Sequence, residues 1–195
     1  MREINYATET KRLQEIGAIC AREQVQIAVP DAKDIMMRGL RYYIGEQAQW
    51  LPEYDQVADW LSDNQGKGLL CYGNCGRGKT ELASRVIPAI IHYWDNRVVK
   101  CYTAEEIGMK LDDAKLAKLS SIDDIGTEGV TNIYGNRMFA LPTIVDEAER
   151  RGNLIILSSN LTLSEIKKKY GARTMDRLRQ ICVPVLFAGD SLRGK

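Results

Sequence analysis

The segment from Gly73 to Thr80, with the sequence GNCGRGKT, constrains the fold of this chain more than any other stretch. It satisfies the pattern G-x-x-x-x-G-K-[ST] at every position and directly follows the apolar run at 69–72. Glycines at this spacing let successive backbone N–H groups point at one phosphate, and the lysine reaches the β- and γ-phosphates. The alternative is a glycine turn with an incidental lysine. The position of the segment, between an apolar run and a helical stretch, favours a nucleotide-binding loop.

The expected ligands of this loop are ATP and a magnesium ion. The predicted ATP-binding residues are Gly73, Asn74, Cys75, Gly76, Arg77, Gly78, Lys79 and Thr80. The Thr80 hydroxyl would be a magnesium ligand, and the helix that follows would present its positive N-terminal end to the phosphates. Pro88 lies inside that helical pattern. Because proline lacks a backbone N–H, we expect it to kink or end the helix.

Five short apolar runs are spaced along the chain, at 69–72, 98–102, 119–122, 154–158 and 183–187. Helical stretches separate most of these runs. The alternation predicts an α/β domain in which a five-stranded, mainly parallel sheet lies between helices. The first 45 residues are predicted to be mostly helical, and the capping-box patterns at Thr103 and Thr162 predict two helix starts.

Composition excludes several classes of protein. The 195 residues predict a single folded domain, and a net charge of +1 means that nucleic-acid binding would need local basic patches. Five scattered cysteines without a C-x-x-C pattern and a single histidine give no zinc framework. No apolar run approaches the ~18 residues of a membrane span, and the start does not resemble a secretion signal. We therefore expect a cytoplasmic protein with no membrane partner.

Two acidic residues follow the third apolar run, in the sequence IDDIG. Asp123, at the predicted strand end, would hold the magnesium ion and its water shell, and Asp124 would polarise the attacking water. An acidic turn after a short strand is the alternative. Ser120 and Ser121 make this strand less apolar than a buried central strand usually is. Asp124 is one methylene shorter than a glutamate, so slow hydrolysis is expected.

Polar residues near the last two strands complete the candidate site. Asn160 would lie beside the γ-phosphate if its strand neighbours that of Asp123; alternatively it turns into the next helix. Arg173 and Arg177 share a helix face, whereas Arg179 does not. An arginine offered to the γ-phosphate of another subunit stabilises phosphoryl transfer. The alternative is a solvated basic helix paired with Asp176.

Taken together, these segments resemble the DnaC/IstB group of AAA+ ATPases, which includes bacterial and phage replicative-helicase loaders. The resemblance covers about residues 50–195 and rests on GLLCYGNCGRGKT, IDDIG, LIILSSNLTLSEIKKKYGARTMDRL and GDSLR. It implies that 73–80 is the Walker A segment and that Asp123 with Asp124 is Walker B. It also implies that Asn160 is the sensor-1 residue and Arg177 the arginine finger.

Further roles follow from the same resemblance. Arg173 would lie beside the arginine finger, and Arg193 would match the sensor-2 arginine. Residues 1–45 would be a short helical segment that binds a partner, and residues 46–195 the ATPase domain, with little or no lid domain. In this group the ATPase domains stack with nucleotide between subunits and hold single-stranded DNA along the inner face.

The resemblance predicts an ATPase, with slow turnover, that loads a hexameric replicative DNA helicase onto single-stranded DNA as an ATP-bridged oligomer. One alternative is a transposition helper, and another is a nucleotide-binding scaffold with little turnover. A small-molecule kinase is disfavoured by Asn160 and Arg177, because kinases of this size supply a substrate pocket and a lid. The basic groups at 150–151 and 167–169 could contact phosphates, but the favoured interpretation is a solvated face.

Overall fold

The computed structural model describes residues 4–19, 22–133 and 136–192. At its centre is a sheet of five parallel strands in the order β2-β3-β6-β1-β7. The strands are β1 (Gly68–Gly73), β2 (Lys100–Thr103), β3 (Leu119–Asp123), β6 (Leu154–Ser159) and β7 (Cys182–Phe187). Each of the five predicted apolar runs forms one of these strands. The predicted α/β fold with a parallel five-stranded sheet is therefore confirmed.

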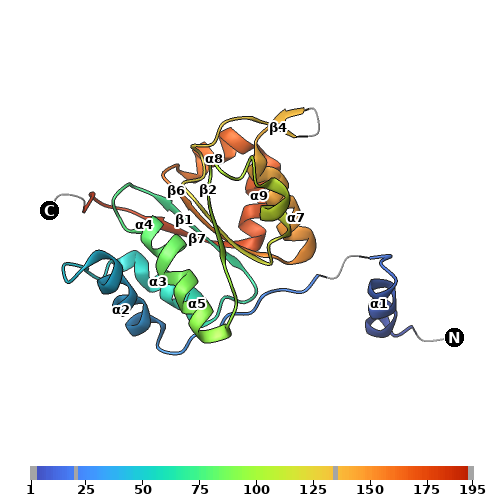
Figure 1. The fold of residues 1–195 in the computed structure, drawn as a ribbon, viewed down its shortest axis with the longest axis horizontal. Helices are drawn as coiled ribbons and strands as arrows, with labels where there is room; N and C mark the ends of the chain where they lie inside the picture. Colours follow the sequence, from blue (N-terminus) through green and yellow to red (C-terminus); the bar gives the residue numbers. More distant parts are fainter. Residues whose placement is uncertain (1–3, 20–21, 134–135, 193–195) are drawn as a thin grey trace.

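Helices cover both faces of this sheet (Figure 1). One layer holds α2 (Ala32–Ile44), α3 (Pro52–Ser62) and α5 (Ile87–Asp95), and the other holds α6 (Leu111–Leu116), α7 (Ala140–Arg151), α8 (Leu163–Tyr170) and α9 (Ala172–Ile181). Side chains alternate along each strand, so Leu69 and Cys71 belong to the first core and Leu70 to the second. Burial on both faces explains why β1 and β6 are mostly continuous apolar runs in the sequence.

The helix after the phosphate loop is irregular. It begins as α4 (Lys79–Glu81), continues as one π-helical segment, η1 (Leu82–Val86), and becomes α5 at Ile87. Pro88 lies in the first turn of α5, where its missing N–H leaves little unpaired. The helix does not end at Pro88, contrary to one of the two predicted outcomes; its hydrogen-bond pattern changes from π to α just before the proline.

The two predicted capping boxes have different outcomes. Thr162 caps α8 and exchanges hydrogen bonds with Glu165, as predicted. Thr103 and Glu106 exchange the same pair of bonds, but turns follow them and α6 begins only at Leu111. The prediction of a helix at Thr103 was therefore wrong, even though the local bonds form.

The N-terminal region combines two helices with an extended segment. α1 (Tyr6–Glu15) and α2 are helical as predicted, but the residues at 22–29 are extended, so the prediction was wrong there. Val25, Ile27 and Val29 are buried alternately along this segment. The buried Asn64 side chain accepts a bond from the Ile27 N–H (2.8 Å) and donates to the Val25 carbonyl (2.9 Å). The division after residue 45 stays a prediction, although residues 25–44 pack into the sheet core.

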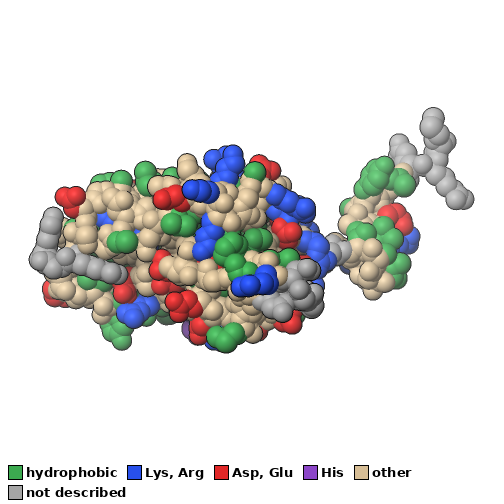
Figure 2. Space-filling model, turned by 90° about the horizontal axis from the view of Figure 1, so that it is seen from above, with side chains coloured by type: hydrophobic (Ala, Val, Ile, Leu, Met, Phe, Trp, Pro, Cys, Tyr) green, Lys and Arg blue, Asp and Glu red, His purple; other side chains and the backbone are tan. Residues whose placement is uncertain are grey.

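Two elements project from this body. None of the residues of α1 is buried, and Figures 1 and 2 show the helix set apart from the rest of the chain. A small antiparallel hairpin, β4 (Thr131–Ile133) and β5 (Asn136–Met138), lies between β3 and α7. Among the described residues, no helix is both long enough and apolar enough to cross a membrane.

Candidate nucleotide-binding site

The phosphate loop connects β1 to α4, and three of its glycines have positive φ: Gly73 (114°), Gly76 (72°) and Gly78 (83°). A Cβ on Gly78 would lie 2.3 Å from the Tyr54 hydroxyl, and a Cβ on Gly73 would lie 2.6 Å from the Phe187 carbonyl oxygen. Both the backbone conformation and the close neighbours therefore require glycine at these positions.

Helix α3 holds this loop from one side. The Arg77 guanidinium donates to both carboxylate oxygens of Glu53, from Nε to Oε1 (2.7 Å) and from Nη2 to Oε2 (2.9 Å), and the two side chains are 11% and 6% exposed. The Tyr54 hydroxyl donates to the Arg77 carbonyl (3.0 Å). The Arg77 side chain thus fixes the loop to α3. The backbone N–H of Arg77, and not its side chain, would contact phosphate in the predicted loop. Glu53 belongs to no sequence motif, so sequence analysis alone could not have identified its role.

The segment after β7 holds the loop from the other side. The Asn74 N–H donates to the Phe187 carbonyl (2.9 Å), and the Asn74 side chain donates to the Gly189 carbonyl (2.8 Å). The Leu192 N–H donates to the Gly76 carbonyl (3.0 Å). Residues 187–192 therefore brace the phosphate loop directly. The predicted sensor-2 residue, Arg193, lies outside the described residues.

The Lys79 ammonium group is buried at the base of the loop, with 6% of the residue exposed. Its Nζ donates to the carbonyls of Gly73 (2.9 Å) and Asn74 (2.6 Å) and to Oδ1 of Asn160 (2.9 Å). Burial lowers the pKa of Lys79 from its usual value. All three partners are uncharged oxygens, so the positive charge of the ammonium is not neutralised by a paired carboxylate.

Asn160 connects Lys79 to the predicted Walker B residues. Strand β6 pairs with β3, as the role of Asn160 required, and the Asn160 Nδ2 donates to Oδ1 of Asp124 (2.7 Å). The Ser158 hydroxyl accepts from the Asp124 N–H (2.9 Å) and donates to the Asp123 carboxylate. Sequence reasoning missed Ser158, which the strand pattern gave no reason to separate from its apolar neighbours. Lys79, Asn160 and Asp124 thus form one continuous chain of contacts.

The two serines of β3 differ: among the described residues the buried Ser120 hydroxyl has no hydrogen-bond partner, whereas the Ser121 hydroxyl has one. Ser120 and Ser121 are fully buried, and the Ser121 hydroxyl donates to the Ala83 carbonyl of η1 (2.8 Å). β3 lies between β2 and β6, inside the sheet. The serine at 121 therefore replaces an apolar contact with a bond that ties the strand to the helix of the phosphate loop.

The side chains at this edge of the sheet suit a magnesium ion that accompanies a nucleotide. The Thr80 hydroxyl is exposed in the first turn of α4, and the Asp123 carboxylate is partly exposed at the end of β3. Hydroxyl and carboxylate oxygens are the donors that magnesium prefers, with phosphate oxygens and water as the remaining ligands. These two residues fit the predicted role.

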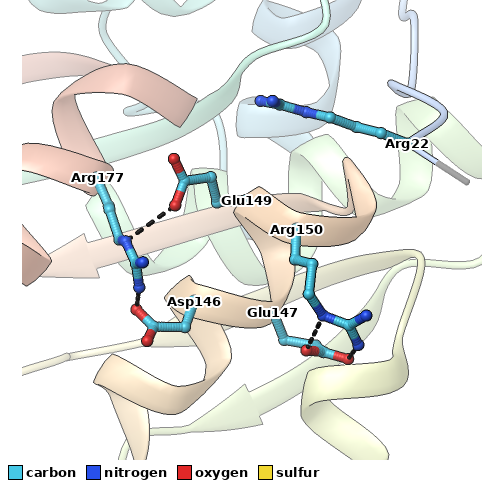
Figure 3. Close-up of a pocket in the computed structure, with 6 residues that line it drawn as sticks. All are labelled: Arg22, Asp146, Glu147, Glu149, Arg150 and Arg177. Atoms are coloured by element: carbon cyan, nitrogen blue, oxygen red, sulfur yellow. Dashed lines mark hydrogen bonds and ion pairs between the residues drawn. The ribbon is translucent and has the colours of Figure 1, made fainter. Parts of the chain in front are cut away.

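The predicted arginines lie away from this group of contacts, on α9. Arg177 is 21% exposed and contacts two carboxylates of α7, Asp146 and Glu149, the latter through Nε at 2.9 Å (Figure 3). Arg173 is 78% exposed and lies 3.9 Å from Asp146, so the two arginines share a helix face as predicted. The ion pairs are made with α7 and not with Asp176. The groove beside them is lined by Arg22, Asp146, Glu147, Glu149, Arg150 and Arg177.

In the two basic groups, Arg150, Arg151 and Lys169 have partners within the chain. Arg150 and Arg151 both bind Glu147, and these guanidinium groups lower the pKa of that carboxyl to about 2. In the group at 167–169, the Lys169 ammonium donates to the carbonyls of Gly126 and Glu128.

No protein-family model matches the chain. A curated relative is the replicative helicase loader DnaI of Bacillus subtilis (strain 168), which is 26% identical over 173 residues. The match covers 73% of this chain and 54% of the relative, so the chain spans about half the length of that protein.

Three solved structures are similar in fold. A crystal structure of DnaI has a TM-score of 0.53 with 18% identity, over 82% of this chain and 87% of that one. The DnaC helicase loader has a TM-score of 0.53 with 14% identity, over 83% and 93%. AMPPCP-bound DnaA from Aquifex aeolicus has a TM-score of 0.52 with 15% identity, over 72% and 49%. These likenesses confirm the predicted fold, and the curated relative confirms the predicted resemblance to helicase loaders.

Proposed function

We propose that this chain is an ATP-dependent loader of a replicative DNA helicase. The observation that carries the proposal is the chain of contacts from Lys79 through Asn160 to Asp124. It joins the lysine of the phosphate loop to the carboxylate that would activate water, which is the arrangement that nucleotide hydrolysis needs. The similarity to a replicative helicase loader supports helicase loading as the use of that hydrolysis.

Each residue of the site then has a role. The loop 73–80 binds the phosphates, and Lys79 exchanges its contacts with the carbonyls of Gly73 and Asn74 for phosphate oxygens. Thr80 and Asp123 would hold the magnesium ion, which would neutralise phosphate charge. Asp124 orients the attacking water, and Asn160 orients Asp124. Because the carboxylate is short and already bonded to Asn160, turnover is slow.

Hydrolysis also requires a second subunit. In the proposed oligomer, Arg177 contacts the γ-phosphate of the neighbouring subunit, with Arg173 beside it and Arg193 acting on the nucleotide of its own subunit. To do so, Arg177 must leave Asp146 and Glu149. ATP therefore favours assembly along single-stranded DNA, and hydrolysis favours release.

Helix α1 is proposed to bind the helicase. None of its residues is buried, so the helix contributes no contact to the core. Apolar side chains in and around it are exposed: Ile4, Tyr6, Leu13, Ile16 and Ile19. Exposed apolar side chains on a helix with no buried residue are typical of a protein-binding segment.

The proposal is tested by size-exclusion chromatography of the full chain with the replicative helicase of its host, with and without ATP. We expect co-elution, and we expect Leu13→Asp combined with Ile16→Asp to abolish it without altering ATP binding. Thr10→Asp is the matched control on the same helix. If the helicase elutes alone while ATP still drives the protein onto DNA, the transposition helper replaces the loader as the proposed function.

A further inference from the structure

The turn that follows β3 has a tightly defined backbone. Asp124 has a φ of 57°, a left-handed conformation that is costly for a residue with a side chain. The Thr127 hydroxyl donates to the Asp124 carbonyl (2.9 Å). Gly126 also has a positive φ, and a Cβ there would lie 2.5 Å from the Leu161 side chain. Contacts from outside the turn must hold such a conformation in place.

Glu128 supplies those contacts from a buried position, with 4% of the residue exposed. One carboxylate oxygen accepts from the Gly126 N–H (2.8 Å), and the other accepts from the Tyr170 hydroxyl. The Lys169 Nζ donates to the Gly126 carbonyl (2.6 Å) and to the Glu128 carbonyl (3.0 Å), and it lies 4.0 Å from the carboxylate. A buried carboxylate with this many partners has a fixed position.

The partners of Glu128 lie where α8 meets α9. Tyr170 is the last residue of α8, and Gly171 separates it from α9, which carries Arg177. Burial, and then the hydrogen bond to Glu128, raise the pKa of Tyr170, so its hydroxyl remains a proton donor. The Phe139 ring, 5.5 Å from that of Tyr170, closes the junction, and Lys169 lies 4.8 Å above the same Phe139 ring.

We propose that Glu128, with Tyr170 and Lys169, positions both the Asp124 turn and helix α9. The inference rests on the proposed function, in which Asp124 serves the subunit's own nucleotide and Arg177 serves that of its neighbour. The Glu128–Tyr170 contact then links two consecutive nucleotide sites through the body of one subunit. Glu128 is a positioning residue, because it acts on the reaction through Asp124 and Arg177.

The test uses mixtures of two inactive variants of the full chain. Arg177→Ala subunits keep Asp124, and Asp124→Ala subunits keep Arg177, so hydrolysis occurs only where the two types meet. Tyr170→Phe, which removes one hydroxyl, is then added to either type. We expect kcat in the mixture to fall about tenfold in both placements, with KM for ATP changed less than twofold.

A matched control is Tyr102→Phe. The Tyr102 hydroxyl also donates to a carboxylate (2.7 Å), but this is Asp113 of α6, whose other hydrogen bond is to Lys100 of β2. It should lower the melting temperature to a similar extent and leave kcat unchanged. If Tyr170→Phe does not fold, Glu128→Gln takes its place in the same two placements.

Other outcomes overturn the link. A fall only when Tyr170→Phe is on the Asp124-bearing subunit would mean that the contact serves one site, and no fall in either placement would mean that it serves neither. If mixtures with Tyr170 intact are inactive, Arg177 does not act across subunits, and the inference fails with that part of the proposed function. This last failure is seen before any Tyr170 variant is added, so the two failures are distinguishable.

Discussion

Two basic side chains of the candidate site are held within one subunit in opposite ways. Lys79 contacts two carbonyls and one amide oxygen, all uncharged, whereas Arg177 contacts two carboxylates. An ammonium surrounded by neutral oxygens keeps its attraction for phosphate, while a guanidinium between carboxylates is largely neutralised. Under the proposed function, the phosphate loop would therefore be ready for nucleotide in the single subunit, and Arg177 would have to exchange partners before it could act.

The largest expected effect comes from Arg177→Ala. If Arg177 acts on the nucleotide of a neighbour, kcat for ATP hydrolysis should fall by on the order of 10³-fold, the lower end of the range for such arginines. ATP affinity, measured by titration calorimetry, should change less than twofold. Arg179→Ala, on the other face of α9, is the control. A large loss of ATP affinity in Arg177→Ala would place the residue at its own nucleotide.

Lys79→Ala tests the other side of the comparison. Two charge-assisted contacts to phosphate would be lost, so the dissociation constant for ATP should rise by on the order of a hundredfold, which in practice abolishes binding. The measurement is titration calorimetry, with Lys168→Ala, an exposed lysine of α8, as the control. Tight ATP binding by Lys79→Ala would remove the basis of the site assignment.

A smaller effect should follow when the carboxylates are neutralised and the arginine is kept. Asp146→Asn combined with Glu149→Gln should raise ATP hydrolysis at low protein concentration by up to about fivefold, because a partly exposed ion pair is worth up to about 1 kcal/mol. Asp112→Asn, on the exposed side of α6, is the control. A decrease in hydrolysis would show that Asp146 and Glu149 orient Arg177 toward the nucleotide, rather than competing with the nucleotide for it.

The smallest expected change concerns the support of the phosphate loop. Glu53→Gln leaves the Arg77 guanidinium without its charged partner, so the loop should be less well ordered and the dissociation constant for ATP should rise about threefold. Glu46→Gln, an exposed carboxyl before α3, is the control. An unchanged affinity would mean that the contacts at Asn74 and Leu192 are sufficient to hold the loop.

Features encoded in contiguous residues could be predicted from the sequence. The loop 73–80, the five strands and the Thr162 capping box each depend on neighbours within a few positions. Asn160 also followed from a local pattern, since it comes directly after an apolar strand. Its predicted place beside the γ-phosphate assumed that its strand neighbours that of Asp123, and the pairing of β3 with β6 confirms that assumption. Its contact with Asp124 was not predicted.

Features that depend on distant partners could not be predicted. Glu53 lies 24 residues from Arg77, and Glu128 lies 42 residues from Tyr170, with no spacing rule to connect them. The segment at 22–29 fell within the first 45 residues, which were predicted to be mostly helical. The Asn64 side chain binds the backbone of this segment, as the backbone of a neighbouring strand would in a sheet, and Asn64 is distant in sequence.

The brace on the phosphate loop has a consequence for biosynthesis. Asn74 and the Gly189 carbonyl that its side chain contacts are 115 positions apart. At about 5–20 residues per second, the ribosome delivers that partner roughly ten seconds after the loop. Until then the glycine-rich segment has no β7 beside it. Under the proposed function, tight nucleotide binding would therefore require the completed sheet. Under the proposed function, a chain still being translated would thereby be kept out of the ATP-dependent assembly.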